Sequence, residues 1–331
     1  MKNGLLKYLV CPRCFEVLKL SMSEQDGTEI ITGSLQCVAC TAEYQILRGV
    51  PRMISGPLSY DKQATAEAFG YEWTHFSELE PTYRNQFLDW IKPTTPGFFR
   101  DKVILDAGCG KGRHAYLASQ FGALDVIGID LSGAVEAAFA NTRVLPNVHI
   151  VQADIFRLPF RAPFDFIYSI GVIHHLPDPR LGFLALFRHL KTQGRISVWV
   201  YGKEGNWWIE KIANPIRVNI TSKLPKSLTK LLAFFIALPL QFGLAAVYRP
   251  VNELGYLQGL RRYLFYNDYL YSISRFSFRE NMSIIFDHMV APTAFYISRG
   301  EIGEWFEEAG LAQVAITQRN RNSWRGTGVR Q

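Results

Sequence analysis

The sequence predicts an α/β fold built around a mostly parallel sheet, and three observations support this. Short apolar runs typical of buried strands recur along the chain, at residues 103–106, 126–130, 148–154 and 164–171. A helical pattern at 112–121 lies between the first two runs, and a glycine-rich turn joins it to the first. With 331 residues and the composition of a globular protein, the chain has room for one large domain and a small one.

The glycine-rich turn is the stretch around which the chain is organised. The first run ends in Asp106, and Gly108, Gly110 and Gly112 follow at alternate positions. Glycine allows positive φ and close approach of a ligand to the backbone, here at the N-terminus of a helix. The exposed amides suit a carboxylate or a phosphate alike. A dinucleotide-binding domain is one alternative, but it requires Gly-x-Gly-x-x-Gly, which this turn does not match.

The following runs narrow the choice of ligand. The second ends in Asp130, at the distance from the first at which an acid can hold a pair of ribose hydroxyls. The third ends in Asp154, and the fourth leads into His174 and His175. Four such motifs occur in order, each at the end of an expected strand. The sequence therefore favours a nucleoside-containing ligand at this edge of the sheet.

Together these stretches resemble the class I S-adenosylmethionine-dependent methyltransferases of the type 11 kind, which have a Rossmann-like seven-stranded sheet. The resemblance implies S-adenosyl-L-methionine as cofactor, with the glycine turn at its methionine end, Asp130 at its ribose and Asp154 at its adenine. The cofactor residues implied in this way are Asp106, Gly108, Cys109, Gly110, Gly112, Asp130, Leu131, Asp154, Ile155, Ser169, Ile170 and Gly171.

Residues 1–55 carry two Cys-x-x-Cys pairs, Cys11 with Cys14 and Cys37 with Cys40. Four thiolates on two tight turns provide tetrahedral sulfur coordination, which selects zinc in a closed structural site. Hairpin strands are expected at 18–20 and 29–35. A redox pair is the alternative, but the strand-to-helix setting is missing. Cysteines used this way indicate a reducing cytoplasm.

The same region resembles the small zinc-ribbon activator subunit that pairs with tRNA, rRNA and protein methyltransferases. The resemblance includes Tyr44 and the Gly-Val-Pro at 49–51. In that family the module stabilises a partner enzyme and covers its apolar surface, and here it is fused to the enzyme. We favour a folding cap over a role in substrate binding, because structural zinc sites chiefly contribute folding energy.

The remaining segments complete the predicted domain plan. Residues 56–97 form a linker and cap helices, and the aromatics of a helix at 64–76 either cover the cofactor or pack on the core. The cofactor-binding core spans 98–201, with a helix at 178–191 and a fifth strand at 195–201. Residues 298–331 return to the core through a helix opened by a capping box and two final strands, at 312–317 and 323–329.

Residues 202–297 form a mainly helical insertion after the fifth strand, at the edge where α/β folds bind ligands. We interpret it as an aromatic substrate lid. Residues 207–280 hold ten of the Lys and Arg residues against four acids, which accounts for nearly all of the net charge of +7. This local excess suggests an anionic partner: membrane headgroups, nucleic acid or an anionic substrate.

Inside the lid, residues 231–248 form an uncharged run with basic flanks. We favour a buried helical hairpin kinked at Pro239. The alternatives are a peripheral helix in the membrane interface, with contact through 223–249, and a true span. Pro239 and Gln241 at the centre of the run disfavour the span, as does an enzyme domain on both sides of it.

The candidate catalytic residues are chosen by their positions, after the fourth expected strand and before the last expected helix. His174 is our candidate for a general base, whereas a structural role is expected for His175. The stretch from Asp287 to Tyr296 resembles one that precedes the last helix in methyltransferases of this fused type, and it adds His288 and Tyr296.

The predicted function is a cytoplasmic methyltransferase for a small or amphiphilic metabolite, peripheral at the inner membrane face if the apolar run contacts lipid. The first apolar run of the chain, at 5–10, is too short for a signal peptide. An RNA methyltransferase acting on tRNA or rRNA is the alternative, motivated by the ribbon and the basic charge. A cofactor-binding scaffold without catalysis is the third hypothesis.

Overall fold

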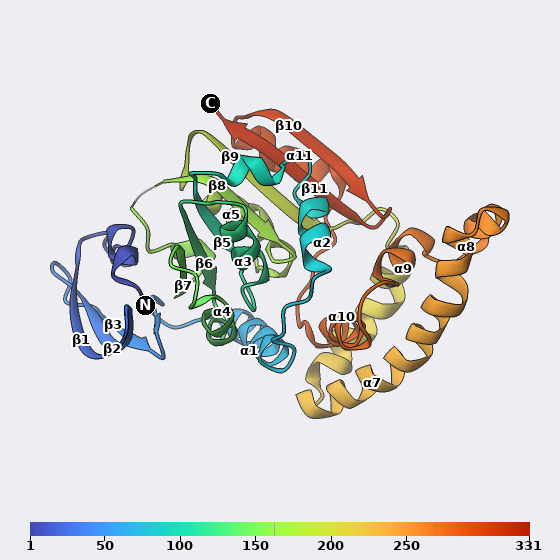
Figure 1. Ribbon diagram of the computed structural model, residues 1–331, viewed down its shortest axis with the longest axis horizontal. Helices are drawn as coiled ribbons and strands as arrows, with labels where there is room; N and C mark the ends of the chain where they lie inside the picture. The colour runs from blue at the N-terminus through green and yellow to red at the C-terminus, as the bar shows by residue number, and fades with distance from the viewer. Residues whose placement is uncertain (162) are drawn as a thin grey trace.

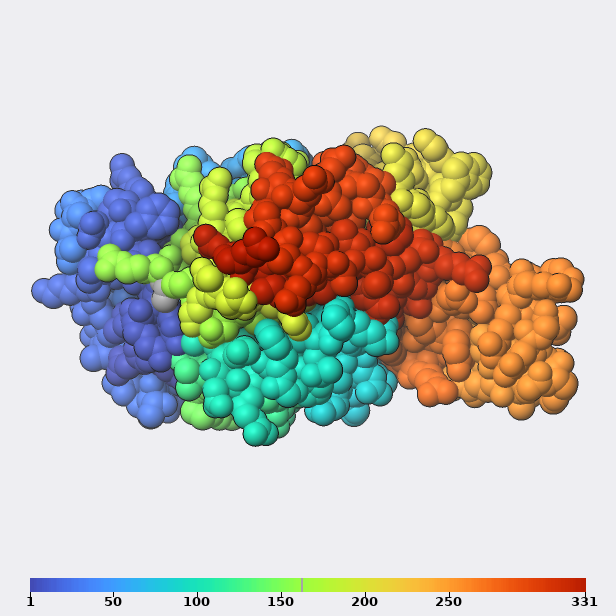
Figure 2. Space-filling view, turned by 90° about the horizontal axis from the view of Figure 1, so that it is seen from above, coloured from blue at the N-terminus to red at the C-terminus, as the bar shows by residue number. Residues whose placement is uncertain are grey.

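The computed structural model describes residues 1–161 and 163–331. Three parts follow one another along its long axis (Figure 1): a small antiparallel sheet at the N-terminus, a central sheet flanked by helices, and a helical insertion at the opposite end. The space-filling view likewise places the N-terminal part and the insertion at opposite ends (Figure 2).

The central sheet has seven strands in the order β10-β11-β9-β8-β5-β6-β7. Neighbours among β5 to β9 run parallel, whereas β10 and β11 are antiparallel to theirs. This arrangement confirms the predicted Rossmann-like fold. The strands are β5 (Val103–Ala107), β6 (Asp125–Asp130), β7 (Val148–Gln152), β8 (Phe164–Ile170), β9 (Leu190–Tyr201), β10 (Leu311–Arg319) and β11 (Ser323–Arg330).

Helices cover both faces of this sheet. One face packs against α2 (Tyr83–Trp90), α3 (Arg113–Gln120) and α4 (Val135–Thr142), and the other against α5 (Pro179–Phe187) and α11 (Arg299–Glu308). Because both faces are buried at the centre of the sheet, β5 and β6 are mostly apolar instead of alternating. On β5, Ile104 packs into one layer and Leu105 into the other, both fully buried.

The segment between α5 and β9 differs from the sequence expectation. A helix was expected to run to residue 191, but it ends at Phe187 and β9 begins at Leu190. Leu190 pairs in parallel with Phe164, so it extends the sheet and does not continue the helix. An irregularity in this pairing then restores the predicted strand from Arg195.

The N-terminal sheet contains β1 (Leu18–Asp26), β2 (Glu29–Cys37), β3 (Glu43–Leu47) and β4 (Val50–Pro51), after a short 3-10 helix η1 (Asn3–Lys7). It covers the edge strand β7 of the central sheet, because the Met53 amide donates to the Gln152 carbonyl at 2.8 Å. The Tyr8 hydroxyl also donates to Asp125 at 2.6 Å. Apolar residues of both parts form one continuous core.

One long helix and several short 3-10 helices complete the part of the chain that precedes the insertion. The 16-residue helix α1 (Tyr60–His75) confirms the helix expected at 64–76, and it begins earlier. Its Trp73 indole lies beside Gly110, so α1 covers the glycine turn. Short 3-10 helices η2 (Pro96–Phe99), η3 (Ile155–Arg157) and η4 (Ile173–His175) complete the core.

The insertion between β9 and α11 is helical, as expected. Its elements are η5 (Ile209–Ala213), α6 (Asn214–Asn219), η6 (Thr221–Lys223), α7 (Lys226–Gly243), η7 (Leu244–Tyr248), α8 (Arg249–Glu253), η8 (Gly255–Tyr263), α9 (Asn267–Ile273) and α10 (Phe278–Val290).

The expected buried hairpin at Pro239 is wrong. The chain forms one continuous helix, Lys226–Glu253, and most of its apolar run is exposed. The proline does not break the helix because Pro239 lies on the exposed side of α7, where water can satisfy the carbonyl that loses its donor.

Candidate functional site

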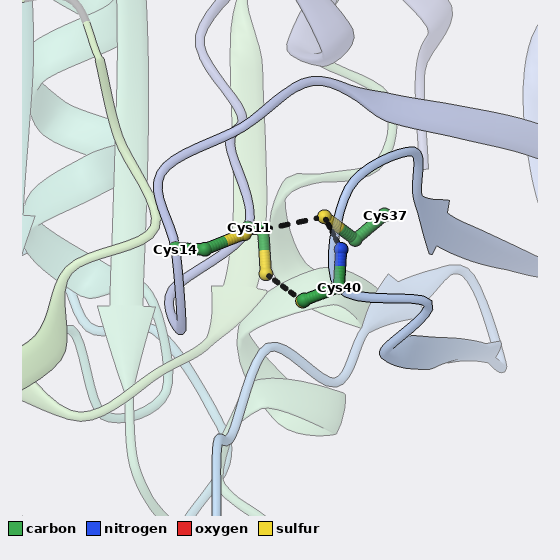
Figure 3. A group of neighbouring side chains, drawn as sticks. All are labelled: Cys11, Cys14, Cys37 and Cys40. Carbon is green, nitrogen blue, oxygen red and sulfur yellow. Dashed lines mark hydrogen bonds between the residues drawn. The ribbon is translucent and has the colours of Figure 1, made fainter.

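The structure brings the four cysteines of the N-terminal sheet together (Figure 3), with their Sγ atoms all within 4.8 Å of one another. Cys11 lies 3.6 Å from Cys40, and Cys14 lies 3.4 Å from Cys37, measured between Sγ atoms. Tetrahedral coordination with Zn–S bonds of about 2.3 Å places sulfur atoms roughly 3.8 Å apart. The Tyr44 hydroxyl contacts Cys11 at 3.3 Å. This group therefore fits a closed structural metal site.

The glycine turn adopts the conformation that its sequence predicts. Gly108 and Gly112 have φ of +85° and +81°. A Cβ on Gly108 would lie 2.3 Å from Cγ2 of Val172, and one on Gly112 would lie 3.1 Å from the backbone of Ala138. The Gly108 amide donates to the Ile129 carbonyl at 2.8 Å, which ties the turn to β6. Only glycine fits this turn without strain.

Asp130 joins the turn to the second strand. One carboxylate oxygen accepts from the Gly110 amide at 2.9 Å, and the other accepts from the amide and the hydroxyl of Ser132 at 2.9 and 2.7 Å. Burial raises the pKa of Asp130, although these hydrogen bonds oppose the shift. A carboxylate has about four acceptor sites, so Asp130 keeps acceptor capacity for a ligand.

The other two strand-end acids have different surroundings. Asp106 lies behind the turn at 1% exposure, and burial raises its pKa to about 8. Asp154 caps η3 by accepting from the Phe156 amide at 3.0 Å, and it forms an ion pair with Lys62 of α1. Asp154 is therefore available at the sheet edge, whereas Asp106 supports the turn from within.

Lys111 links the turn to the insertion, which the sequence did not indicate. Its side chain is 2% exposed and donates to the Phe76 carbonyl at 2.8 Å and to the Tyr83 hydroxyl at 2.7 Å. Glu280 of α10 lies 3.7 Å away and also pairs with Arg113 at 3.3 Å. Burial lowers the pKa of Lys111 to about 8. These contacts hold α10 against the glycine turn.

A cavity of about 710 Å³ opens at the carboxyl ends of β5 to β8. One half, here called the cofactor half, contains most of the residues expected at the cofactor: Gly108, Cys109, Gly110, Asp130, Leu131, Asp154, Ile155, Ile170 and Gly171. Asp106, Gly112 and Ser169 do not appear in its lining. Ser169 is fully buried and donates to the Ala107 carbonyl at 2.8 Å. Their contact with a ligand stays a prediction.

The other half, here called the acceptor half, is formed by the insertion. Apolar side chains from α7, α9 and α10 and the segments between them line it: Ile236, Leu240, Phe265, Leu270, Ile273, Phe276, Ile284 and Ile285. The two halves form one cavity, in the upper part of the range of roughly 300–1,000 Å³ for small-molecule sites. The insertion thus supplies one side of this cavity.

Residues 105–198 match the protein family described as "Methyltransferase domain". This segment is a methyltransferase domain. Relatives match part of the chain: a tRNA U34 carboxymethyltransferase of Cellvibrio japonicus is 31% identical over 146 residues, which cover 41% of this chain and 45% of that protein. A trans-aconitate 2-methyltransferase of Deinococcus radiodurans is 39% identical over 99 residues, covering 29% of this chain and 37% of that protein.

The chain thus spans less than half of the length of these two relatives. Among solved structures, the magnesium protoporphyrin IX methyltransferase of Synechocystis PCC 6803 has a TM-score of 0.46 at 14% identity, over 84% of this chain and 100% of that one.

The histidines of the methyltransferase domain and its lid have different positions. His174 is fully buried against Tyr201, with ring centroids 4.0 Å apart, and is absent from the cavity lining. Its position does not support our choice of general base. His175 and His288 do line the cavity, and His175 bonds to the Thr293 carbonyl at 2.6 Å. Burial lowers the pKa of His288, so its imidazole is neutral near pH 7.

The sequence alone did not indicate that two acids outside the methyltransferase domain line the same cavity. Glu72 of α1 and Asp287 of α10 both line the cavity. Glu72 is 1% exposed and accepts from Ser283 at 2.8 Å; burial and then the charge of Asp287 raise its pKa well above the usual range. Asp287 accepts from the Tyr201 hydroxyl at 3.0 Å. Because the two acids are far apart along the chain, no local sequence pattern reveals that they line the same cavity.

Arg217 of α6 was also missed. It is 3% exposed, it lines the cavity, and it donates to Asn214. Within residues 1–161 and 163–331 its Nε has no hydrogen-bond partner, and no carboxylate forms an ion pair with it. A buried guanidinium without a counter-charge is costly, so this position favours a ligand that is electron-rich or anionic. Tyr296 lies in the same lining.

Proposed function

We propose that the protein is an S-adenosylmethionine-dependent methyltransferase whose acceptor is a small amphiphilic molecule. The observation that carries this proposal is the shared cavity: the strand-end acids and the glycine turn open into the same space as the apolar lid. A nucleotide-binding scaffold would not need a second, apolar half. Catalysis by methyl transfer requires both reactants in one water-poor site.

The cofactor half fits S-adenosylmethionine. Gly108 and Gly110 of the glycine turn line the cavity, so a ligand can approach their backbone, and Asp130 keeps acceptor capacity for a ribose hydroxyl. Asp154, one strand further, lines the same half of the cavity and is our candidate for contact with the adenine. When bound, the cofactor supplies an electrophilic methyl group on a sulfonium. The protein then needs to align the acceptor and exclude water, which by itself can provide much of the rate enhancement.

The acceptor half suits a molecule with an apolar body and one polar head. Side chains such as Leu240, Phe265 and Ile273 provide the apolar surface. The polar groups of this half include Arg217 of α6 and Asp287 and His288 of α10. Because Arg217 lacks a carboxylate partner among the described residues, it can orient a head with an anionic or electron-rich oxygen.

His288 is our candidate for proton removal from the acceptor. It lines the cavity, and its lowered pKa leaves the imidazole unprotonated near neutral pH, as a base requires. Asp287 precedes it and stabilises the protonated form after transfer. Tyr201 holds Asp287 through its hydroxyl and stacks on His288, with ring centroids 5.6 Å apart. This arrangement supports a base oriented by its neighbours.

For the four cysteines we propose a structural zinc ion. Their spacing fits tetrahedral sulfur ligation, and the N-terminal sheet shares its apolar core with the methyltransferase domain. None of the described residues of this sheet lines the cavity. A folding role accounts for both observations.

The alternative is methylation of tRNA or another RNA. Several relatives are tRNA U34 carboxymethyltransferases, and the insertion is basic. Incubation with labelled S-adenosylmethionine and a cell extract, then separated into RNA, lipid and small-molecule pools, tests the choice. We expect label in the lipid or small-molecule pool, and much less with Asp130→Asn at the same cofactor concentration. Label confined to RNA would establish the alternative, and label in no pool would favour a non-catalytic scaffold.

A further inference from the structure

The long helix of the insertion has an exposed apolar side, and we propose that this side docks into the interface of an anionic lipid membrane. The elements α7, η7 and α8 form one helix of 28 residues, Lys226–Glu253, whose most apolar 18-residue window has a mean hydropathy of 2.0. Only 17% of its most apolar window is buried. Apolar surface of this extent on a folded protein marks an interaction site.

The two sides of this helix differ in residue size. The buried side carries small residues, Thr229, Ala233 and Ala237, and packs on α10. The opposite side carries large ones: Leu231, Phe235, Leu238 and Phe242, whose exposed fractions are 51%, 59%, 47% and 75%. These four follow one another at steps of four, three and four residues, so they form one continuous stripe along the helix.

The charge around the stripe selects the partner. From residue 212 to residue 252 the chain contains no acid, and Lys223, Lys226, Lys230 and Arg249 flank the stripe in the sequence. A second copy docked through this stripe would bring like charges together. An anionic lipid surface would attract them instead, by about 1 kcal/mol for each Lys or Arg that reaches it. The combination of an apolar stripe and a basic rim is typical of helices in the membrane interface.

The helix is long enough to span a bilayer, but its contacts indicate that it lies in the membrane plane. Gln241 accepts from Asn281 of α10 at 2.7 Å, so the helix is fastened at its centre to the rest of the insertion. Before it, Thr221 donates to the Met289 carbonyl at 2.7 Å. After it, Arg261 donates to the Asn252 carbonyl. A span would break these contacts, whereas an interfacial position preserves them.

The helix that carries the stripe also borders the acceptor half of the cavity, through residues on its other sides. Ile236 and Leu240 belong to the same helix as the stripe and line the cavity. In Figure 1 this helix forms the outer edge of the insertion, and in Figure 2 the insertion protrudes at one end of the molecule. If the proposed function holds, an amphiphilic acceptor would enter from the lipid surface. The docking itself does not depend on that function.

Flotation of the full-length protein with vesicles tests the proposal. We expect binding to vesicles of phosphatidylcholine with 30% phosphatidylglycerol, weakened by salt, and much less to phosphatidylcholine alone. The double variant Phe235→Gln/Phe242→Gln should bind at least about tenfold more weakly, because burial of even one phenyl ring is worth that factor. Lys223→Glu/Lys230→Glu should lose the preference for anionic vesicles.

The matched control is Leu124→Gln/Val144→Gln, which replaces two side chains that are 56% and 80% exposed on the central domain and should leave vesicle binding unchanged. Absence of binding by the folded wild type would overturn the proposal. So would a dimer in light scattering that Phe235→Gln/Phe242→Gln abolishes, because the stripe would then bind a second copy. Calorimetry with S-adenosylhomocysteine on the same samples separates failure of the proposed function from failure of docking.

Discussion

Replacing Gly108 by alanine tests the glycine turn directly. The new Cβ would lie 2.3 Å from Cγ2 of Val172, and the backbone φ of +85° is one that alanine rarely adopts. The left-handed conformation costs about 1–2 kcal/mol and the overpacking about 1–3 kcal/mol. We therefore expect the free energy of unfolding to fall by about 2–5 kcal/mol, a large part of the roughly 5–15 kcal/mol typical of a domain.

Urea unfolding followed by circular dichroism measures this loss. Gly97→Ala is the control, because a Cβ there meets nothing within 4 Å and its φ is ordinary. In Gly108→Ala/Val172→Ala the two Cγ contacts are removed and only the Cβ of residue 172 stays close, at 2.9 Å, so part of the loss should return while the backbone cost persists. A Gly108→Ala variant no less stable than Gly97→Ala would refute the assigned turn conformation.

Three further predictions concern metal, pH and catalysis. The purified protein should contain one zinc ion per chain, lost in Cys37→Ser and retained in Cys109→Ser by elemental analysis; zinc sites of this type contribute on the order of 10 kcal/mol to folding. Protein free of zinc and stably folded would contradict the ribbon assignment. For Lys111, the pKa of about 8 lies below the ordinary 10.5, so the folded state binds fewer protons than the unfolded state between these pH values and stability rises with pH there. From pH 7.5 to 9.5 the wild type should gain about 2 kcal/mol in urea unfolding relative to Lys111→Met, and an equal slope in both proteins would exclude this shift. His288→Gln should reduce kcat by roughly 10²–10⁴-fold with unchanged affinity for S-adenosylhomocysteine, and an unreduced kcat would remove His288 as the base.

The central sheet was predictable because its signals are local. The run at 103–105, Asp106 and the glycines after it lie within one short stretch, and the structure places them as a strand and a turn. The cysteine pairs are equally local, since each Cys-x-x-Cys fixes two ligands on one turn. Apolar pattern, turn chemistry and spacing all agree at these positions.

The parts that could not be predicted depend on contacts between distant segments. Lys111 lies in the glycine turn, and only the fold shows that Glu280 of the insertion lies 3.7 Å from it. His174 and His175 are neighbours, and the backbone at the end of β8 decides which one faces the cavity. The composition of the apolar run containing Pro239 predicts a helix. It does not predict which side of this helix the rest of the protein covers.

Isothermal titration calorimetry of the wild-type protein tests the central claim that the cavity at the strand ends holds a sulfonium nucleoside. We expect S-adenosylmethionine and S-adenosylhomocysteine to bind with one molecule per chain, and Asp130→Asn to weaken both by about tenfold or more, through loss of a charge-assisted hydrogen bond. Binding of NAD by the folded protein, with no heat from either nucleoside, would contradict the account.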